Sequence, residues 1–250
     1  SLRKGECMKR VGAVICNFNK KEDVLNCIQS VLESKYTDYD LYVVDNASSD
    51  GSAEAIREKY GSQVTVLVNA ENLGGSGGFN TGLRKALEKG YEYLYCLDND
   101  VLVDENAMGE LVAFLDTHPD SGMAGSRVYH MENPGVIQQF GQIVDFKDYC
   151  TEAKFLGKTD ADGIPDVEYS DAVAACSLMV RKSLIDEIGL MPKIIFSTGT
   201  IPSGDTAVTL QVTKWHQSAV PWCFTAWAQK KRLSTHFQHI MRGATGFISL

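Results

Sequence analysis

Two carboxylates stand one residue apart, at Asp98 and Asp100, directly after the apolar run 93–97. An extended turn can direct both of them, or one of them and the neighbouring Asn99, toward a single hard cation held against a diphosphate. Taken alone, this spacing is more often found in a solvated turn. Its position after the fourth of a series of predicted strands reverses that preference and favours a cation site.

Another acidic residue, Asp45, ends the apolar stretch 41–44. At the end of a strand in a nucleotide-binding fold, such an acid accepts hydrogen bonds from a base or a ribose. Asp50 precedes Gly51 and Ser52 and is better explained by an Asx turn that caps the next helix. We therefore expect a ligand contact from Asp45 and a structural one from Asp50, with Ser52 as the helix N-cap.

Residues 72–80 (NLGGSGGFN) contain four glycines ahead of a predicted helix. Glycine lets the backbone approach a ligand closely, and a helix N-terminus favours negative charge. The candidate ligand contacts here are Asn72, Gly75, Gly78 and Asn80, and the alternative is a purely flexible loop. The segment is a poor match to a dehydrogenase fingerprint, because that motif follows the first strand, where this chain has Asn-Phe-Asn-Lys at 17–20.

Strands and helices alternate through the first hundred residues. Short apolar runs predict strands buried on both faces of a sheet, and apolar residues at helical spacing predict the connecting helices. The predicted strands are 11–16, 41–44, 64–68 and 93–97, and the predicted helices are 22–34, 52–60 and 78–89. This order indicates an α/β fold with a doubly wound, mostly parallel sheet, whose ligands lie beyond the carboxyl ends of the strands. All three polar segments fall at such ends.

The second half of the chain is less regular. A helix to Leu115 and a short strand at 123–124 precede a stretch typical of hairpins, 128–165, and then come a strand at 171–180 and a helix at 182–188. No internal repeat or low-complexity linker divides the sequence. Its length of 250 residues therefore predicts a single main domain.

The formal net charge of −8 argues against a nucleic-acid groove and against a strongly basic, membrane-facing surface. Ligand phosphates must then be met by a metal or by backbone amides. The seven cysteines lack CxxC spacing, which is typical of reduced, structural thiols. No apolar run reaches the length of a membrane span, and the first ten residues have no apolar centre, so we expect a cytoplasmic protein, or one peripheral to the inner face of the membrane.

In their order and spacing, these segments resemble the family 2 glycosyltransferases of the GT-A fold. The matching stretches are 16–20, 44–52, 72–82 and 97–101, and NLGGSGGFN is most similar to the galactofuranosyl- and rhamnosyltransferase-like branch. The resemblance implies a UDP- or dTDP-sugar donor, a glycan or lipid-linked acceptor, inversion of the sugar, and a role in polysaccharide or cell-envelope assembly. It places the nucleotide against Cys16, Asn17, Asn19 and Asp45, and Mg²⁺ or Mn²⁺ with the diphosphate at Asp98 and Asp100. Asn99 is a further candidate contact to the donor.

The likeness covers about residues 10–195, after an N-terminal extension of residues 1–9. An inverting transferase needs a general base, which in this family is an acid of an Asp-Asp-x-Glu-Trp motif, followed by a metal-ligating His. Residues 195–205 contain no paired acids, and of the 32 acidic residues only Asp205 lies from Phe196 onward. Residues 196–250 therefore form an atypical, irregular tail, in which we assign no catalytic residue.

Two explanations of the tail remain open. If it is a coding segment read out of frame, a shifted reading from residue 196 permits Asp-Asp-Thr-Glu-Trp in the expected place, and the chain would bind its donor but lack its base. If it is a genuine divergent end, Asp205 would be the base, with a metal ligand among His216, His236 and His239. The functional alternatives are a non-catalytic nucleotide-sugar binding protein and a sugar nucleotidyltransferase.

Overall fold

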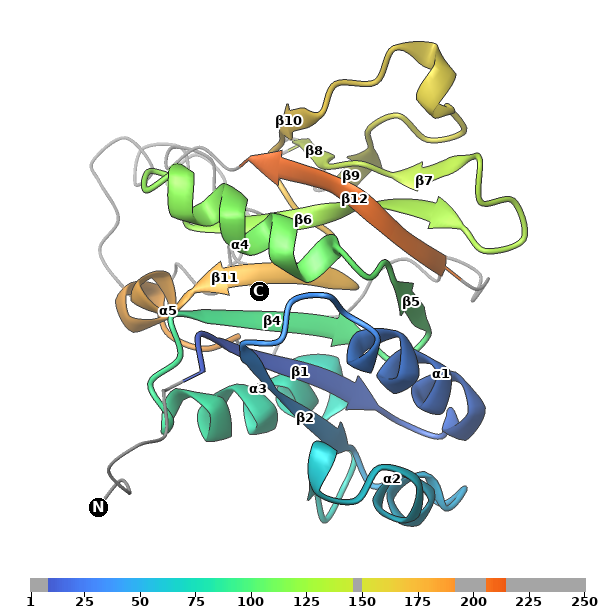
Figure 1. Ribbon diagram of the computed structural model, residues 1–250, viewed down its shortest axis with the longest axis vertical. Coiled ribbons are helices and arrows are strands. Elements are labelled where there is room, and N and C mark those ends of the chain that lie inside the picture. The colour runs from blue at the N-terminus through green and yellow to red at the C-terminus, as the bar shows by residue number, and fades with distance from the viewer. Residues whose placement is uncertain (1–8, 146–149, 192–205, 215–250) are drawn as a thin grey trace, which may run out of the picture.

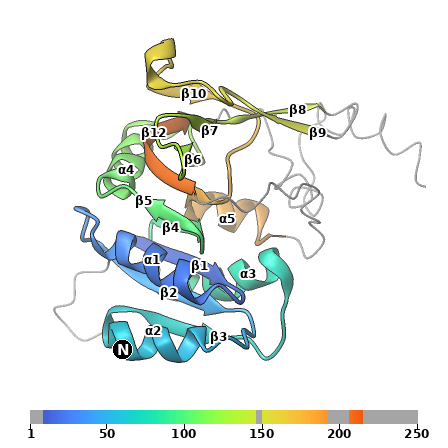
Figure 2. The same ribbon diagram turned by 90° about the vertical axis from the view of Figure 1, so that its right-hand side faces the viewer.

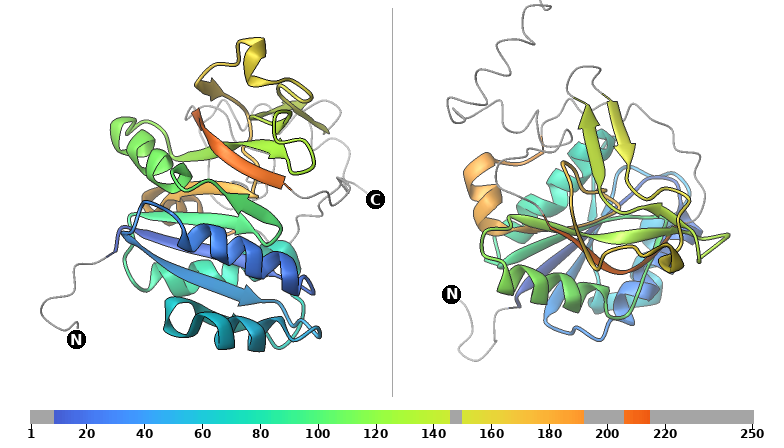
Figure 3. Two further views of the ribbon diagram at one scale, coloured as in Figure 1. Left: turned by 45° about the vertical axis from the view of Figure 1, so that its right-hand side comes forward. Right: turned by 90° about the horizontal axis from the view of Figure 1, so that it is seen from above.

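A computed structural model describes residues 9–145, 150–191 and 206–214 (Figure 1). Its central mixed sheet contains, in spatial order, β10 (Val167–Tyr169), β12 (Thr206–Lys214), β6 (Met123–His130), β11 (Ser177–Arg181), β4 (Tyr93–Asp98), β1 (Val11–Asn17), β2 (Tyr39–Asp45) and β3 (Thr65–Val68). Two short strands extend this sheet, since β5 (Val101–Val103) pairs with β12 and β7 (Ile137–Gln139) pairs with β6. A separate two-stranded sheet of β8 (Gln142–Asp145) and β9 (Cys150–Ala153) projects beyond it (Figures 2 and 3).

The four strands predicted from apolar runs form the parallel half of the sheet. Within it, β1 pairs with β2 and β4, and β2 pairs with β3, all in parallel. The register sets Asn17 opposite Asp45 and Cys16 opposite Asp98. The polar residues that end the apolar runs therefore lie side by side at one edge of the sheet, and the predicted α/β fold class is confirmed.

Helices cover both faces of the sheet (Figure 2). One face packs against α1 (Lys21–Leu32), α2 (Ser52–Tyr60) and α4 (Ala107–Thr117), and the other packs against α3 (Gly74–Leu87) and α5 (Lys182–Ile188). Two short 3-10 turns, Gly61–Gln63 and Asp160–Asp162, complete the described helices. In β1, Ala13 and Ile15 face the first set of helices and Val14 faces the second, and all three are fully buried. Burial on both faces explains the continuous apolar run in the sequence.

The glycine-rich segment belongs to α3 and is not the loop that the sequence predicts. The helix begins at Gly74, directly after Leu73 as its N-cap residue. Glycine disfavours a helix interior, so its presence needs a packing reason. A Cβ on Gly78 would overlap Cys16 Sγ, and a Cβ on Gly82 would overlap the Val14 side chain. The missing side chains therefore let α3 lie directly on β1.

Other boundaries also differ from the prediction. Gly51, with φ of 79°, is the N-cap of α2, so Ser52 is the first helical residue rather than the cap. The strand expected at 123–124 continues to His130, because three neighbouring strands pair with it. The strand expected over 171–180 is confined to Ser177–Arg181 and runs antiparallel to β4.

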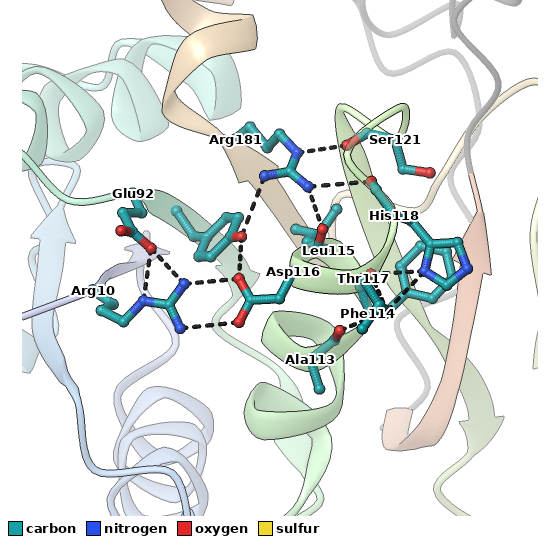
Figure 4. Close-up of polar contacts among 11 residues, drawn as sticks. Arg10, Glu92, Ala113, Phe114, Leu115, Asp116, Thr117, His118, Ser121 and Arg181 are labelled. Atoms are coloured by element: carbon teal, nitrogen blue, oxygen red, sulfur yellow. Dashed lines mark hydrogen bonds and ion pairs between the residues drawn. The ribbon is translucent and has the colours of Figure 1, made fainter.

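A network of charged groups joins α4 to the sheet near the amino ends of β1 and β4 (Figure 4). Arg10 donates to both carboxylate oxygens of Asp116, at 2.7 and 3.0 Å, and to Glu92 Oε2 at 2.6 Å. Tyr93 donates to the same Asp116 carboxylate at 2.7 Å. Arg181 donates to the last carbonyls of α4, where positive charge is favourable.

We expect Asp116→Ala to lower the free energy of unfolding by about 1 to 2 kcal/mol at pH 7, because hydrogen bonds to charged groups at a half-exposed site are lost. The hydrogen bond from Arg10 holds the pKa of Asp116 below its ordinary value, so this stabilisation is lost as the pH falls through that lowered pKa. The difference between the two proteins should therefore narrow in strong acid. Urea unfolding of both proteins at pH 7 and in strong acid measures this difference in stability. Glu110→Ala, on the exposed face of α4, is the matched control.

Candidate functional site

The loops that follow β1 and β2 are hydrogen-bonded to each other. Asn19 has a left-handed backbone, with φ of 51°, and its side-chain oxygen accepts from Ser49 N at 2.8 Å. In return, Asn19 N donates to Ser48 Oγ at 2.9 Å. The Asp50 carboxylate accepts from the first amides of two helices, Lys21 N at 2.9 Å and Ser52 N at 3.0 Å. The predicted capping role of Asp50 is confirmed, and it extends to α1.

A chain of hydrogen bonds connects the tips of β4, β1 and β2. Asn99 Nδ2 donates to Asn17 Oδ1 at 2.7 Å, and Asn17 Nδ2 donates to Asp45 Oδ2 at 3.4 Å. The other oxygen of Asp45 accepts from Ser48 N at 2.9 Å. Asn17 and Asp45 are 0% and 1% exposed, so both are enclosed parts of this chain. The structure thus brings together predicted residues from three separate segments.

The carboxylate pair lies at the end of β4, beside this chain. Lys20 Nζ contacts Asp100 Oδ2 at 2.6 Å, so one cation already faces the pair. Desolvation and then the charge of Asp100 raise the pKa of Asp98 to about 6, and the charge of Lys20 opposes the shift. Asp100 is therefore close enough to destabilise the charged form of Asp98. Lys20 is not among the residues predicted from the sequence, although its place after the first strand could have indicated it.

This donor set fits a hard divalent cation that also binds a phosphorylated ligand. In the described part of the chain, no group of three or more His, Cys, Asp or Glu side chains could hold a metal ion. A closed protein site is thus absent there. Mg²⁺, by contrast, commonly binds through one or two carboxylates and takes its other ligands from water and substrate phosphates. Asp98 and Asp100 supply that number of carboxylates.

Asn46 organises the entry to α3, and the sequence analysis missed it. Its side chain is 2% exposed and donates to Asn72 Oδ1 at 2.8 Å and to Gly74 O at 3.1 Å. Its oxygen accepts from Asn69 Nδ2 and Leu73 N, at 2.9 and 3.1 Å. Asn72 therefore shapes the turn before α3. Its position directly after Asp45 was the available signal for Asn46.

Among the remaining predicted residues, only Gly75 is exposed, with open space where a side chain would be. Gly78 is buried against Cys16. Asn80 is 3% exposed, and both ends of its amide bond the backbone of Met191, at 2.6 and 3.0 Å. Desolvation, Asp98 and Asp45 raise the pKa of the Cys16 thiol to about 12, so it stays neutral. Gly78 and Asn80 thus have structural contacts, and a ligand contact of either stays a prediction.

A family model for glycosyl transferase family 2 matches residues 13–188. The chain belongs to this family. The match includes most of β1, all of β2 to β4 and the carboxylate pair, the elements that build the polar edge of the sheet.

Curated relatives match only in part. The poly-β-1,6-N-acetyl-D-glucosamine synthase of Staphylococcus epidermidis is 28% identical over 113 residues, which are 45% of this chain and 27% of the relative. The same-named enzyme of Staphylococcus aureus strain COL is 31% identical over 91 residues, or 36% of this chain and 21% of the relative. The chain thus aligns with about a quarter of their length. Neither name belongs to the galactofuranosyl- and rhamnosyltransferase-like branch, which stays a prediction.

Solved structures support the GT-A fold. The mannosyltransferase PcManGT from Pyrobaculum calidifontis, in complex with GDP-Man and Mn²⁺, superposes with a TM-score of 0.58 at 18% identity over 94% of this chain and 68% of that chain. S. aureus TarS 1-349, in complex with UDP-GlcNAc, gives 0.52 at 12% identity over 93% of this chain and 64% of that chain. At these identities the likeness concerns the fold alone.

Most residues of the tail, 196–250, lie outside the described part of the chain. This includes Asp205, His216, His236 and His239, so neither explanation of the tail is tested. The described part of the tail, Thr206–Lys214, forms β12 of the central sheet.

We expect Asp98→Asn to stabilise the fold in EDTA at pH 8. The pKa of Asp98 is raised from 3.8 to about 6, so its ionised form penalises the folded state fully above pH 6 and not below 3.8. Two pKa units correspond to about 3 kcal/mol, an upper bound for the gain at pH 8. The gain should vanish at pH 4. Urea unfolding at both pH values measures it, and the exposed Glu58→Gln should show no pH-dependent gain; an equal gain at pH 4 would contradict the assignment.

Proposed function

We propose that this chain binds a nucleotide-diphosphate sugar and a divalent cation at the carboxyl edge of β1, β2 and β4, as the donor half of a glycosyltransferase. The observation that carries the proposal is the single hydrogen-bonded edge on which Asp45, Asn17 and the Asp98–Asp100 pair meet. Membership of glycosyl transferase family 2 supports it. So do the nucleotide sugars and Mn²⁺ in complexes of proteins with the same fold.

The cation would be held by Asp98 and Asp100, with Lys20 as a further positive charge beside the diphosphate. When bound, a divalent cation neutralises the negative charge that develops on a departing diphosphate. The nucleoside would lie against the first two strand tips, with Asn19 holding the two loops together. Phe18, between Asn17 and Asn19, is 44% exposed and offers an aromatic surface for the base.

Transfer with inversion requires a base that takes the proton of the acceptor hydroxyl. The resemblance places this acid after residue 195, so the donor half described above does not supply it. We assign UDP- or dTDP-sugars as donors and a glycan or lipid-linked acceptor, in polysaccharide or cell-envelope assembly. The names of the staphylococcal polysaccharide synthases support this assignment. We place the protein in the cytoplasm or at the inner face of the membrane.

A non-catalytic nucleotide-sugar binding protein is the second candidate. One observation favours it: a single acidic residue among positions 196–250 leaves few groups that could act as base. A sugar nucleotidyltransferase is less well supported, because the basic, glycine-rich signature expected after the first strand is absent from Asn-Phe-Asn-Lys at 17–20. Both candidates bind the nucleotide sugar, but only the proposed glycosyltransferase also turns it over. An assay of donor turnover therefore separates them.

We expect Asp100→Asn to weaken Mn²⁺-dependent binding of UDP by about 10- to 100-fold, because one of two carboxylate ligands is lost. Calorimetry with UDP and Mn²⁺ measures the affinity, and a titration in EDTA measures the metal-independent part. Glu58→Gln, which removes the same charge from the exposed face of α2, should leave the affinity unchanged. Equal affinity with Mn²⁺ and with EDTA in the parent protein would refute the proposed cation site.

If the tail is read out of frame, restoring the alternative frame from residue 196 should raise the rate of sugar transfer or donor hydrolysis by about 10²- to 10⁴-fold, the usual contribution of a general base. UDP affinity should change little, since its site lies in the unaltered part. Sequencing genomic DNA across codons 190–200 is the independent check. An uninterrupted frame, together with full activity of the present chain, would dispose of the hypothesis.

A further inference from the structure

A cavity of about 590 Å³ lies between α1, β5 and Met131. Its volume lies in the range of small-molecule sites. The cavity is lined on the helix side by Asp23, Asn26, Gln29 and Glu33, and Asp100 also lines it. At 1.5 Å per residue, the helix side is about 15 Å long, so the cavity suits a chain-like ligand rather than a compact one.

Helical spacing places these polar side chains on one face of α1. They recur every three or four positions, while Val24, Ile28 and Val31 point into the core from the opposite face. Asn26, Gln29 and Glu33 are exposed, and Gln29 Nε2 donates to Glu33 Oε1 at 2.9 Å. The helix therefore has one face that packs on the sheet and another that lines the cavity.

The side chains that line the cavity disfavour a negatively charged ligand. Among the described residues that line it, three are carboxylates and two are amides, and none is a lysine, an arginine or a histidine. Carboxylates repel phosphates and acidic sugars, while carboxylate and amide groups together accept from and donate to hydroxyl groups. On the other wall, Leu102 is 37% exposed, and with Met131 it offers apolar surface to the C–H faces of a sugar ring. The combination fits an uncharged, hydroxyl-rich chain.

We propose that this cavity binds a neutral saccharide chain, with one end beside Asp100. This inference rests on the proposed function, in which Asp100 holds the donor's diphosphate through a cation. A saccharide seated here would have its terminal hydroxyl next to the donor site, as an acceptor requires. The cavity residues on α1 are separate from the strand tips, so saccharide binding and donor binding can be disrupted independently.

The test uses the full chain and NMR titration with four probes: cellotetraose and chitotetraose, which are neutral, tetragalacturonate, which is anionic, and tetraglucosamine, which is cationic. We expect at least one neutral tetrasaccharide to bind and tetragalacturonate not to bind. The double variant Asn26→Ala/Gln29→Ala should weaken neutral binding about tenfold, as expected for two lost hydrogen bonds. Glu22→Ala, on the same helix but outside the cavity, should leave it unchanged.

UDP affinity with Mn²⁺, measured on the same samples, separates the two proposals. The double variant should keep it, which also shows that the variant is folded, whereas Asp98→Asn should lose it and keep saccharide binding. Absence of neutral binding, binding of the charged probes alone, or an equal loss with Glu22→Ala would overturn the saccharide site. Saccharide binding without any UDP binding would leave this site in place and refute the donor site.

Discussion

The buried hydrogen bonds from Asn99 through Asn17 to Asp45 fix the geometry on which the rest of the polar edge depends. Each residue ends or follows a different strand, and the parallel register of those strands makes the three meet. An enclosed amide or carboxylate without a hydrogen-bond partner would cost about 1 to 3 kcal/mol. These hydrogen bonds therefore hold the strand tips and the loops together as one unit. Asp98, Asp100 and Lys20 lie beside this unit, and Lys20 contacts Asp100 at 2.6 Å.

The two ends of the sheet treat carboxylates in opposite ways. At the amino end, Arg10 and Tyr93 donate to Asp116 and hold its pKa below the ordinary value, so that charge stabilises the fold. At the carboxyl end, desolvation and Asp100 raise the pKa of Asp98, so that charge destabilises the fold. A bound cation would offset the destabilising charge at Asp98. At Asp116, the charge is already stabilised by Arg10, so a cation would add little there. Perturbed groups of this kind favour a functional role for the carboxyl end.

The sequence predicted what depends on local pattern. Apolar runs identified β1 to β4, because strands buried on both faces need nearly continuous apolar sequence. The same strand ends identified Asp45, Asn17 and the carboxylate pair. The local pattern did not indicate that Gly78 and Gly82 allow close helix–sheet packing. Their neighbours in the fold, Cys16 and Val14, are distant in the sequence. The roles of Asn46 and Asn80, and the antiparallel pairing of β11 with β4, depend on residues that are distant in the sequence. Local pattern therefore could not predict them.

The parallel half of the sheet forms no strand pairing with β12, the part of the tail that the structure describes. β12 pairs with β5, β6 and β10, and none of its described pairings involves β1, β2, β3 or β4. Its first residue, Thr206, pairs with Val101, the residue directly after Asp100. Among the described residues, β12 therefore connects to the carboxylate pair by way of β5 and forms no ladder with the strands that carry the hydrogen-bonded tips. In the proposed function, donor binding would depend on these strand tips, whereas the base for transfer would have to come from the end of the chain.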